Sequence, residues 1–173
     1  MLNTLRKRKD RWIARLLVAF PALYHKWVDS GEFVKSQDIP WSSLDKPASA
    51  CKLAFITTGG FYVSGQEPFN MDDPEGDPSF REIPSVIDPS LLQISHNYYD
   101  HRDAEVDPNI ILPVGIAQKL VEMGDVKEIN HRFFSFMGHL TGDQLETLQI
   151  ETAPEVAKLL VADGVEIAIL TPA

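Results

Sequence analysis

The sequence has 173 residues, of which 44% are hydrophobic and 24% are charged, a composition typical of a soluble globular protein and most simply of one domain. The net charge of −9 is uneven, because residues 1–26 carry seven of the sixteen Lys and Arg residues and one acidic residue, Asp10. The acidic remainder would repel phosphate, so nucleic acid is not an expected partner. No apolar run reaches the roughly 18 residues of a membrane span, so no membrane location is expected. The single cysteine, Cys51, excludes an internal disulfide framework and indicates a cytoplasmic location.

The basic first segment, residues 1–28, predicts a long amphipathic helix. Arg15 interrupts its apolar run and no small-residue cleavage site follows, which argues against a secretion signal. The alternative is a surface that docks on an acidic partner or on membrane lipids. Residues 29–51 are polar and broken by prolines, and predict a connector to a single α/β domain over residues 52–173. The residues expected to face inward from the helix are Trp12, Leu16, Leu17 and Phe20.

The first half of the domain is predicted to contain two strands. Residues 52–58 are apolar and end at a pair of glycines, as expected for a strand followed by a sharp turn. A loop rich in Pro, Gly and Asp then covers about residues 64–90, and loops of this length without secondary structure are uncommon and often functional. Residues 91–99 predict the second strand.

The second half of the domain alternates between helix and strand. Residues 114–125 and 152–164 predict helices, the latter capped by Thr152. Residues 131–140 are aromatic and predict a strand or a packed loop, and residues 165–170 alternate as a closing strand. Short joints between these elements favour an α/β fold: a three-layer, mainly parallel sheet with flanking helices.

The stretch "FITTGG" ends the first predicted strand with two hydroxyls and two glycines. Exposed backbone N–H groups in such a turn can hold a carboxylate or a phosphate. Tight-turn geometry explains the pattern equally well, because the spacing matches no phosphate-binding fingerprint. The candidate residues are Thr57, Thr58, Gly59 and Gly60.

The stretch "GDPSFREIP" places Arg81 beside Glu82 in the long loop. Arg81 could hold a substrate carboxylate through two parallel hydrogen bonds, while Glu82 could orient it or exchange a proton. The simpler interpretation, favoured on these residues alone, is a loop held by one local ion pair.

The densest polar cluster, "SHNYYDHRDAEVD", follows the second predicted strand. Its spacing is similar to the "HxHxDH" metal-ligand motif of metallo-β-lactamase-type hydrolases, but Tyr98 stands where a ligand histidine is required, so no metal is expected. A His96 that handles protons and is held by Asp100 fits better. Gly138, before His139, indicates a close approach of the backbone to another group.

In their order along the chain these segments resemble one family. The motifs "TTGGFYVSGQEPF", "GDPSFREIP", "SHNYYDHRDAEVDPN", "HRFFSFMGH" and "APEVAKLLVADGVEIAILTP" are together similar to the protein B family of glycine/sarcosine/betaine/D-proline reductases. The resemblance covers about residues 52–172 and leaves out the basic segment and the connector.

The resemblance implies an oxidoreductase: a subunit of a selenol- or thiol-dependent reductase that cleaves a carbon–nitrogen bond of an amino acid or of its N-methylated derivative. In such enzymes a selenolate or thiolate attacks the α-carbon and the amine leaves, and selenolate suits this step because it is deprotonated at neutral pH. The implied partners are other reductase subunits and a small amino-acid-like substrate. A partner subunit supplies a pyruvoyl group, and no cofactor is expected in this chain.

The resemblance also implies roles for the polar residues quoted above. His96, positioned by Asp100, would protonate the departing amine or stabilise the selenolate. Arg81 would grip a carboxylate and Glu82 would hold Arg81. The residues expected to shape the pocket are Thr57, Thr58, Gly59, Gly60 and Ser95.

In the family, the strand that matches "VEIAILTP" continues into a segment of the form (Cys or selenocysteine)-Pro-Val-Cys. The sequence stops one residue after Pro172, which predicts a reading frame cut at a UGA codon, an inactive fragment, and exposed apolar surface that promotes association. The alternatives are a non-catalytic binding or assembly protein with a reductase-like fold and a metal-dependent hydrolase.

Overall fold

The computed structural model describes residues 42–173 and ten residues of the basic segment. Contacts divide the chain into two compact units, Met1–Asp45 with Asn97–Asp100, and Lys46–His96 with His101–Ala173. Most of the predicted helix over residues 1–28 and most of the predicted connector lie outside the described residues. Two side chains expected to face inward, Trp12 and Phe20, are exposed instead. The ten described residues are Lys9, Trp12, Ile13, Leu16, Ala19, Phe20, Ala22, Leu23, His25 and Lys26.

The main sheet is centred on β1 (Lys52–Thr57). Strand β7 (Ile167–Thr171) pairs with β1 in parallel along five residues on one side. On the other side, β5 (Glu128–Ile129) pairs with the first residues of β1, and β6 (Arg132–Phe136) pairs with its last residues. The predicted strands at residues 52–58 and 165–170 are thus confirmed, and the aromatic segment is a strand rather than a packed loop.

A fifth strand, β3 (Phe80–Pro84), pairs antiparallel with β6 at the edge of this sheet. The prediction of a structureless loop over residues 64–90 is therefore wrong in its second half. The strand is short and carries charged residues, so the sequence gives little indication of it. Its register is set by contacts with β6, including the ring pair Phe80–Phe134 with centroids 5.8 Å apart.

The predicted strand at residues 91–99 is only three residues long. β4 (Leu92–Ile94) pairs antiparallel with β2 (Phe61–Val63) in a separate two-stranded sheet. Short 3₁₀ turns precede and follow these strands along the chain. The first α-helix after β4 is α3 (Arg102–Val106). The 3₁₀ turns are Ala48–Ala50, Pro89–Leu91 and Pro108–Ile110.

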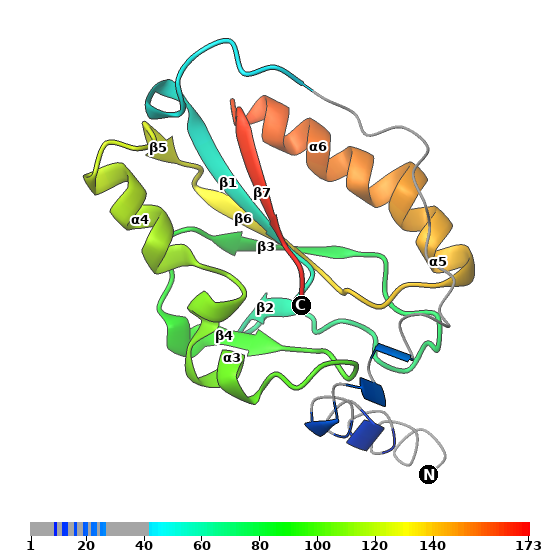
Figure 1. Ribbon diagram of the computed structural model, residues 1–173. Coiled ribbons are helices and arrows are strands. Elements are labelled where there is room, and N and C mark those ends of the chain that lie inside the picture. The colour runs from blue at the N-terminus through cyan, green and yellow to red at the C-terminus, as the bar shows by residue number, and fades with distance from the viewer. Residues whose placement is uncertain are drawn as a thin grey trace. The chain divides into compact units, whose positions relative to one another are not determined.

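Two longer helical segments cover opposite faces of the main sheet (Figure 1). α4 (Val114–Glu122) lies on one face, and α5 (Gly142–Thr147) and α6 (Ala153–Ala162) lie on the other. A π-helical turn, Leu148–Thr152, joins α5 directly to α6. Thr152 is therefore helical and does not cap α6 as predicted; its hydroxyl donates to the Pro78 carbonyl at 2.8 Å. The α/β prediction is confirmed, with a mixed but mostly parallel sheet.

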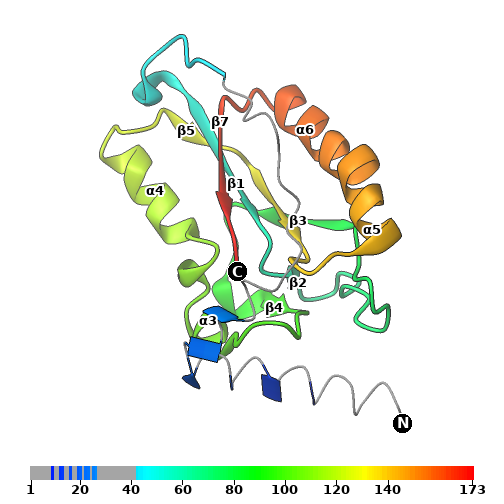
Figure 2. The same ribbon diagram turned by 45° about the vertical axis from the view of Figure 1, so that its right-hand side comes forward.

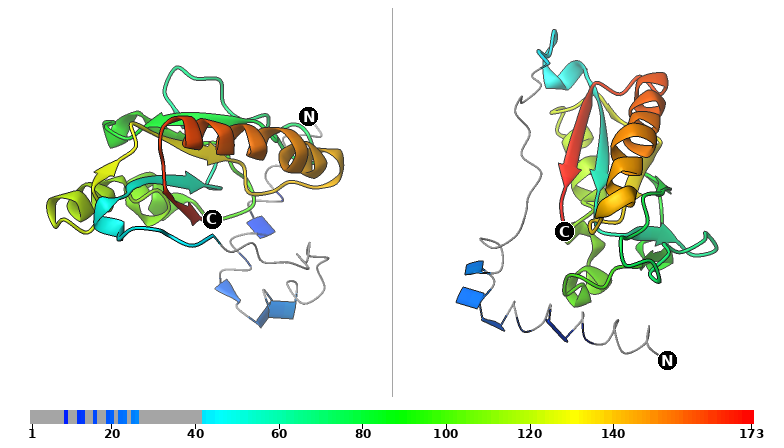
Figure 3. Two further views of the ribbon diagram at one scale, coloured as in Figure 1. Left: turned by 90° about the horizontal axis from the view of Figure 1, so that it is seen from above. Right: turned by 90° about the vertical axis from the view of Figure 1, so that its right-hand side faces the viewer.

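The order of the parallel strands positions the site. The first parallel strand in the chain, β1, lies between the second (β5 and β6) and the third (β7). The connections therefore run in opposite directions from β1, with α4 on one face and α6 on the other, as the two views of Figure 3 also show. In such sheets ligands bind beyond the carboxyl ends of the strands where the direction reverses, here between β1 and β7.

Candidate functional site

The carboxyl ends of β1 and β7 lie side by side (Figure 2). They are joined by hydrogen bonds of hydroxyl groups. The Thr57 hydroxyl, fully buried, donates to the Thr171 carbonyl at 3.2 Å, and the Thr58 N–H donates to the same carbonyl at 3.2 Å. The Thr58 hydroxyl accepts from the Ala173 N–H at 3.2 Å. Two predicted site residues thus lie at the point where the strand order reverses.

The turn after β1 does not offer the anion site that its glycines suggest. The Gly59 N–H donates to the Thr57 hydroxyl at 3.1 Å, and the Gly60 N–H donates to the Phe136 carbonyl at 2.9 Å. Since the Thr58 N–H is bonded to Thr171, none of these three donors points to a ligand.

The glycines are instead required by close packing. A Cβ atom on Gly60 would lie 2.6 Å from the Ser95 carbonyl oxygen, and the residue has φ +69°. A Cβ atom on Gly59 would lie 2.9 Å from the side chain of Ile111. Ser95, a predicted site residue, takes part through its backbone: its N–H donates to the Gly60 carbonyl at 2.9 Å.

His96 is brought to this turn by the backbone pairing of Ser95 with Gly60. Its side chain is 5% exposed. A Cβ atom on Gly138 would lie 3.3 Å from His96 Nε2 and 3.0 Å from the Thr58 carbonyl oxygen. The predicted close approach at Gly138 is confirmed, and it places the imidazole next to the ends of β1 and β6.

Burial, together with the neighbouring charges of His139 and His101, lowers the pKa of His96 to about 4. The imidazole is therefore neutral at pH 7, where it can donate one hydrogen bond and accept another. This state does not supply the imidazolium expected from the sequence. Asp100, its predicted partner, belongs to the other compact unit, so the pairing of these two residues stays a prediction.

Arg81, on strand β3, is bound to the loop that precedes this strand. Its guanidinium donates to the carbonyls of Glu67, Phe80 and Pro68 and to the Ser79 hydroxyl, at 2.7 to 3.2 Å. It also lies 4.3 Å from the centre of the Phe69 ring. These contacts hold residues 67–80 against the edge of the sheet, and they occupy most of the N–H groups that a carboxylate would need.

Glu82 points away from Arg81, because adjacent residues of a strand face opposite sides. Its carboxylate accepts from Arg132 Nη1 at 3.0 Å. The expected contact in which Glu82 holds Arg81 is thus not formed: Glu82 belongs instead to an ionic network with Arg132 and Asp163.

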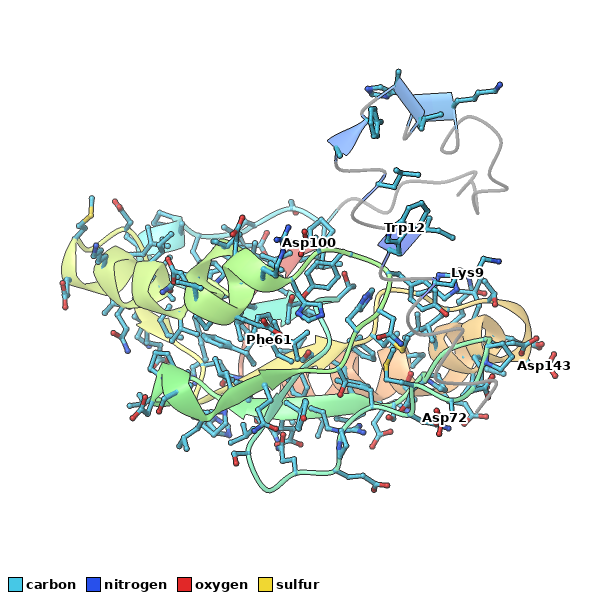
Figure 4. The ribbon with its side chains drawn as sticks, turned by 90° about the horizontal axis from the view of Figure 1, so that it is seen from below. Lys9, Trp12, Phe61, Asp72, Asp100 and Asp143 are labelled. Atoms are coloured by element: carbon cyan, nitrogen blue, oxygen red, sulfur yellow. The ribbon has the colours of Figure 1, made fainter. Side chains whose placement is uncertain are left out.

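A cavity of about 320 Å³ adjoins the turn on the α6 face. Its walls are apolar except for Thr58. The helical wall is anchored through α5, whose Asp143 N–H donates to Glu75 at 3.2 Å, while Gln144 donates to Asp73 at 3.2 Å. Figure 4 labels Asp143, which lies on α5, and Asp72, in the loop that also carries Asp73 and Glu75. This cavity was not predicted, because its walls come from segments far apart in the chain.

Within the described part of the chain, no group of three or more His, Cys, Asp or Glu side chains is placed to hold a metal ion. Among the helices described there, none is both long enough and apolar enough to span a membrane.

Comparison with known families matches residues 35–173 to glycine/sarcosine/betaine reductase selenoprotein B. The chain belongs to this selenoprotein B family. The match begins inside the predicted connector, so the family region is longer than the motifs alone indicate.

A curated relative of this selenoprotein B family chain is the D-proline reductase subunit gamma of Acetoanaerobium sticklandii, 31% identical over 131 residues. The aligned region is 76% of this chain and 52% of the relative, so the chain spans about half the length of that subunit. No solved structure matches the chain.

Proposed function

We propose that the chain is part of a reductase subunit that cleaves a carbon–nitrogen bond of an amino acid or an N-methylated amino acid with a selenol or thiol nucleophile. Family membership and the similarity to a D-proline reductase subunit support the reaction class. The observation that carries the placement of the site is the junction of β1 and β7 next to the buried His96.

The nucleophile of the proposal belongs directly after the Thr171–Pro172 stretch, where the family resemblance puts a selenocysteine or cysteine. That group would supply a deprotonated chalcogen that attacks carbon at neutral pH. The residues present fit such a group: Thr57 and Thr58 fix the backbone that leads to it, and the absence of a side chain at Gly138 lets His96 and Thr58 pack close to this backbone.

His96 is proposed as a neutral hydrogen-bonding group at this site. Its depressed pKa opposes an imidazolium at pH 7, so we assign it the orientation of the substrate amine or the donation of a hydrogen bond to the nucleophile. Arg81 is not kept as a carboxylate clamp, because its donors are bonded within the loop. The partners proposed are other subunits of the reductase, one of which carries the pyruvoyl group.

The experiment is amino-acid reduction by the full-length gene product with its partner subunits and a dithiol as the electron source, with glycine, sarcosine, betaine and D-proline as candidates. His96→Ala is expected to lower the rate by about 10²–10³, the effect of removing one positioned hydrogen-bonding group from a reaction site. The matched control is His131→Ala, an exposed histidine that precedes β6, which should keep the wild-type rate. A loss below tenfold for His96→Ala would contradict the role proposed for His96. Failure of the enzyme to reduce any of the four candidate substrates would contradict the proposed reaction.

A further inference from the structure

The cavity beside Thr58 has the size and lining of a small-molecule pocket. Its volume of about 320 Å³ lies at the small end of the range of roughly 300–1,000 Å³ found for ligand sites. From the sheet it is lined by Ile56, Phe136 and Leu170, and from the helical layer by Leu148, Val156 and Leu160, among others. Lining of this kind favours a hydrocarbon body over a charged one.

The cavity meets the proposed reaction site at one place. Thr58 and Gly138 belong to its wall, and the position of a Cβ atom on Gly138 is 3.3 Å from both the Thr58 hydroxyl and His96 Nε2. A molecule whose apolar part fills the cavity would therefore lie against the Thr58 hydroxyl, while His96, which is not among the lining residues, packs against Gly138.

The absence of charged residues from the described part of the lining restricts the class of ligand further. The described lining residues include no Lys, Arg, Asp or Glu, so nothing in the wall neutralises a charged group placed inside. The pocket lies between the α6 face of the sheet and the helical layer, and Thr58 connects it to the carboxyl ends of β1 and β7, the region where ligands of such folds bind. Its modest volume suits an amino-acid-sized molecule.

We infer that this cavity is a specificity pocket that takes the aliphatic part of the substrate, so that the subunit prefers a small ligand with several methylene or methyl groups over one without. This inference rests on the proposed function for the identity of the reaction, and it names the substrate class of the same site. The pocket itself can be tested without any reaction.

The test uses the full 173-residue chain and three uncharged probes, acetamide, butyramide and hexanamide, with binding measured by calorimetry and by methyl NMR. Each buried methylene contributes about a fourfold gain in affinity, so a tenfold or greater gain is expected for each step of two methylenes. The methyl signals of Leu148 and Leu160 should shift on titration.

Ala157→Phe provides the matched variant, because Ala157 lines the cavity from an exposed position of α6 and a larger side chain fills the space. It should abolish the dependence on chain length. Val161→Phe, on the same helix at a position 76% exposed and outside the lining, should leave that dependence unchanged. Unfolding midpoints of both variants verify that they fold.

Three outcomes would overturn the inference: affinities independent of chain length, a dependence that survives Ala157→Phe, or a cavity occupied by a second copy. The last would appear as a dimer in sedimentation that binds no probe and becomes monomeric in Ala157→Phe. If hexanamide binds as expected while the full-length enzyme reduces no candidate amino acid, the pocket stands and the proposed reaction falls.

Discussion

The two ends of the main sheet are built from different chemistry. At the amino end of β6 and β7, Asp163 accepts two hydrogen bonds from Arg132, at 2.8 and 2.9 Å, and one from Asn130 at 3.0 Å. Arg132 also bonds to Glu82, and Lys52 donates to the Asp163 carbonyl at 3.0 Å. The carboxyl end instead has hydroxyls, glycines and a buried neutral histidine.

The pKa shifts at the two ends of the sheet reflect this difference: one end favours a charged group and the other a neutral group. The hydrogen bonds and charge of Arg132, together with Asn130, lower the pKa of Asp163 to about 2, so the charged form is favoured there. Burial lowers the pKa of His96 to about 4, so the neutral form is favoured. The amino end uses charge to hold strands together, whereas the carboxyl end brings together hydroxyls, glycines and a neutral imidazole at the place proposed here for the site.

The largest effect on stability is expected from Gly60→Ala at the carboxyl end. The new Cβ atom would meet the Ser95 carbonyl oxygen at 2.6 Å, and φ +69° is unfavourable for alanine. We expect a loss of about 3 kcal/mol or more in the free energy of unfolding, measured by urea denaturation.

Gly164→Ala separates the two causes. Gly164 has φ +75° and no neighbouring atom within 4 Å of the added carbon, so it should lose only about 1 kcal/mol from backbone strain. Equal losses in the two variants would show that the contact with Ser95 is not required.

The second largest effect on the free energy of unfolding is expected from the protonation of His96 at acid pH. Its pKa is about 4 in the folded protein against an ordinary 6.5, so between these values the unfolded chain binds the proton and the folded chain does not. Stability is therefore retained above pH 6.5 and lost as the pH falls toward 4. Between pH 7.5 and 4.5 this group should remove roughly 2 to 3 kcal/mol.

His96→Gln should abolish that part of the loss in urea denaturation at the two pH values. His131→Gln, which replaces an exposed histidine, should keep the wild-type pH dependence. A wild-type pH dependence in His96→Gln would show that the histidine is not kept neutral by the fold.

The sequence predicted the elements that depend on local pattern. The apolar run of β1, the periodicity of α4 and α6 and the alternation of β7 were each sufficient, and the turn residues marked where the chain approaches itself at Gly60 and Gly138. These features are set by neighbours along the chain.

The sequence failed where partners come from distant segments. β3 was missed because an edge strand of mixed polarity is stabilised by β6, about fifty residues away. The same pairing places Arg81 and Glu82 on opposite sides, so the contact expected from adjacency does not form. The N–H groups of the turn after β1 were expected to bind a ligand, but they are used by Thr57, Thr171 and Phe136. The cavity was missed for the same reason, because its walls come from several segments of the chain.

A smaller effect is expected when charge is removed from the amino end. Arg132→Met deletes the donors to Asp163 and Glu82 and leaves the Asp163 carboxylate, whose side chain is 10% exposed, with fewer partners. We expect a loss of about 2 kcal/mol in the free energy of unfolding at pH 7. Glu82→Gln removes the outer pair alone, and since the Glu82 side chain is 45% exposed, it should cost about 0.5 kcal/mol.

The pH dependence distinguishes this end from the other. Because the folded pKa of Asp163 is about 2 against an ordinary 3.8, the stability that it contributes is present above pH 3.8 and is lost as the pH falls through 2. Arg132→Met should therefore leave the loss between pH 7.5 and 4.5 unchanged, while His96→Gln removes it. If Arg132→Met altered the loss in that window instead, the two ends would be electrostatically coupled, and the contrast between a charged end and a charge-free end would not describe this sheet.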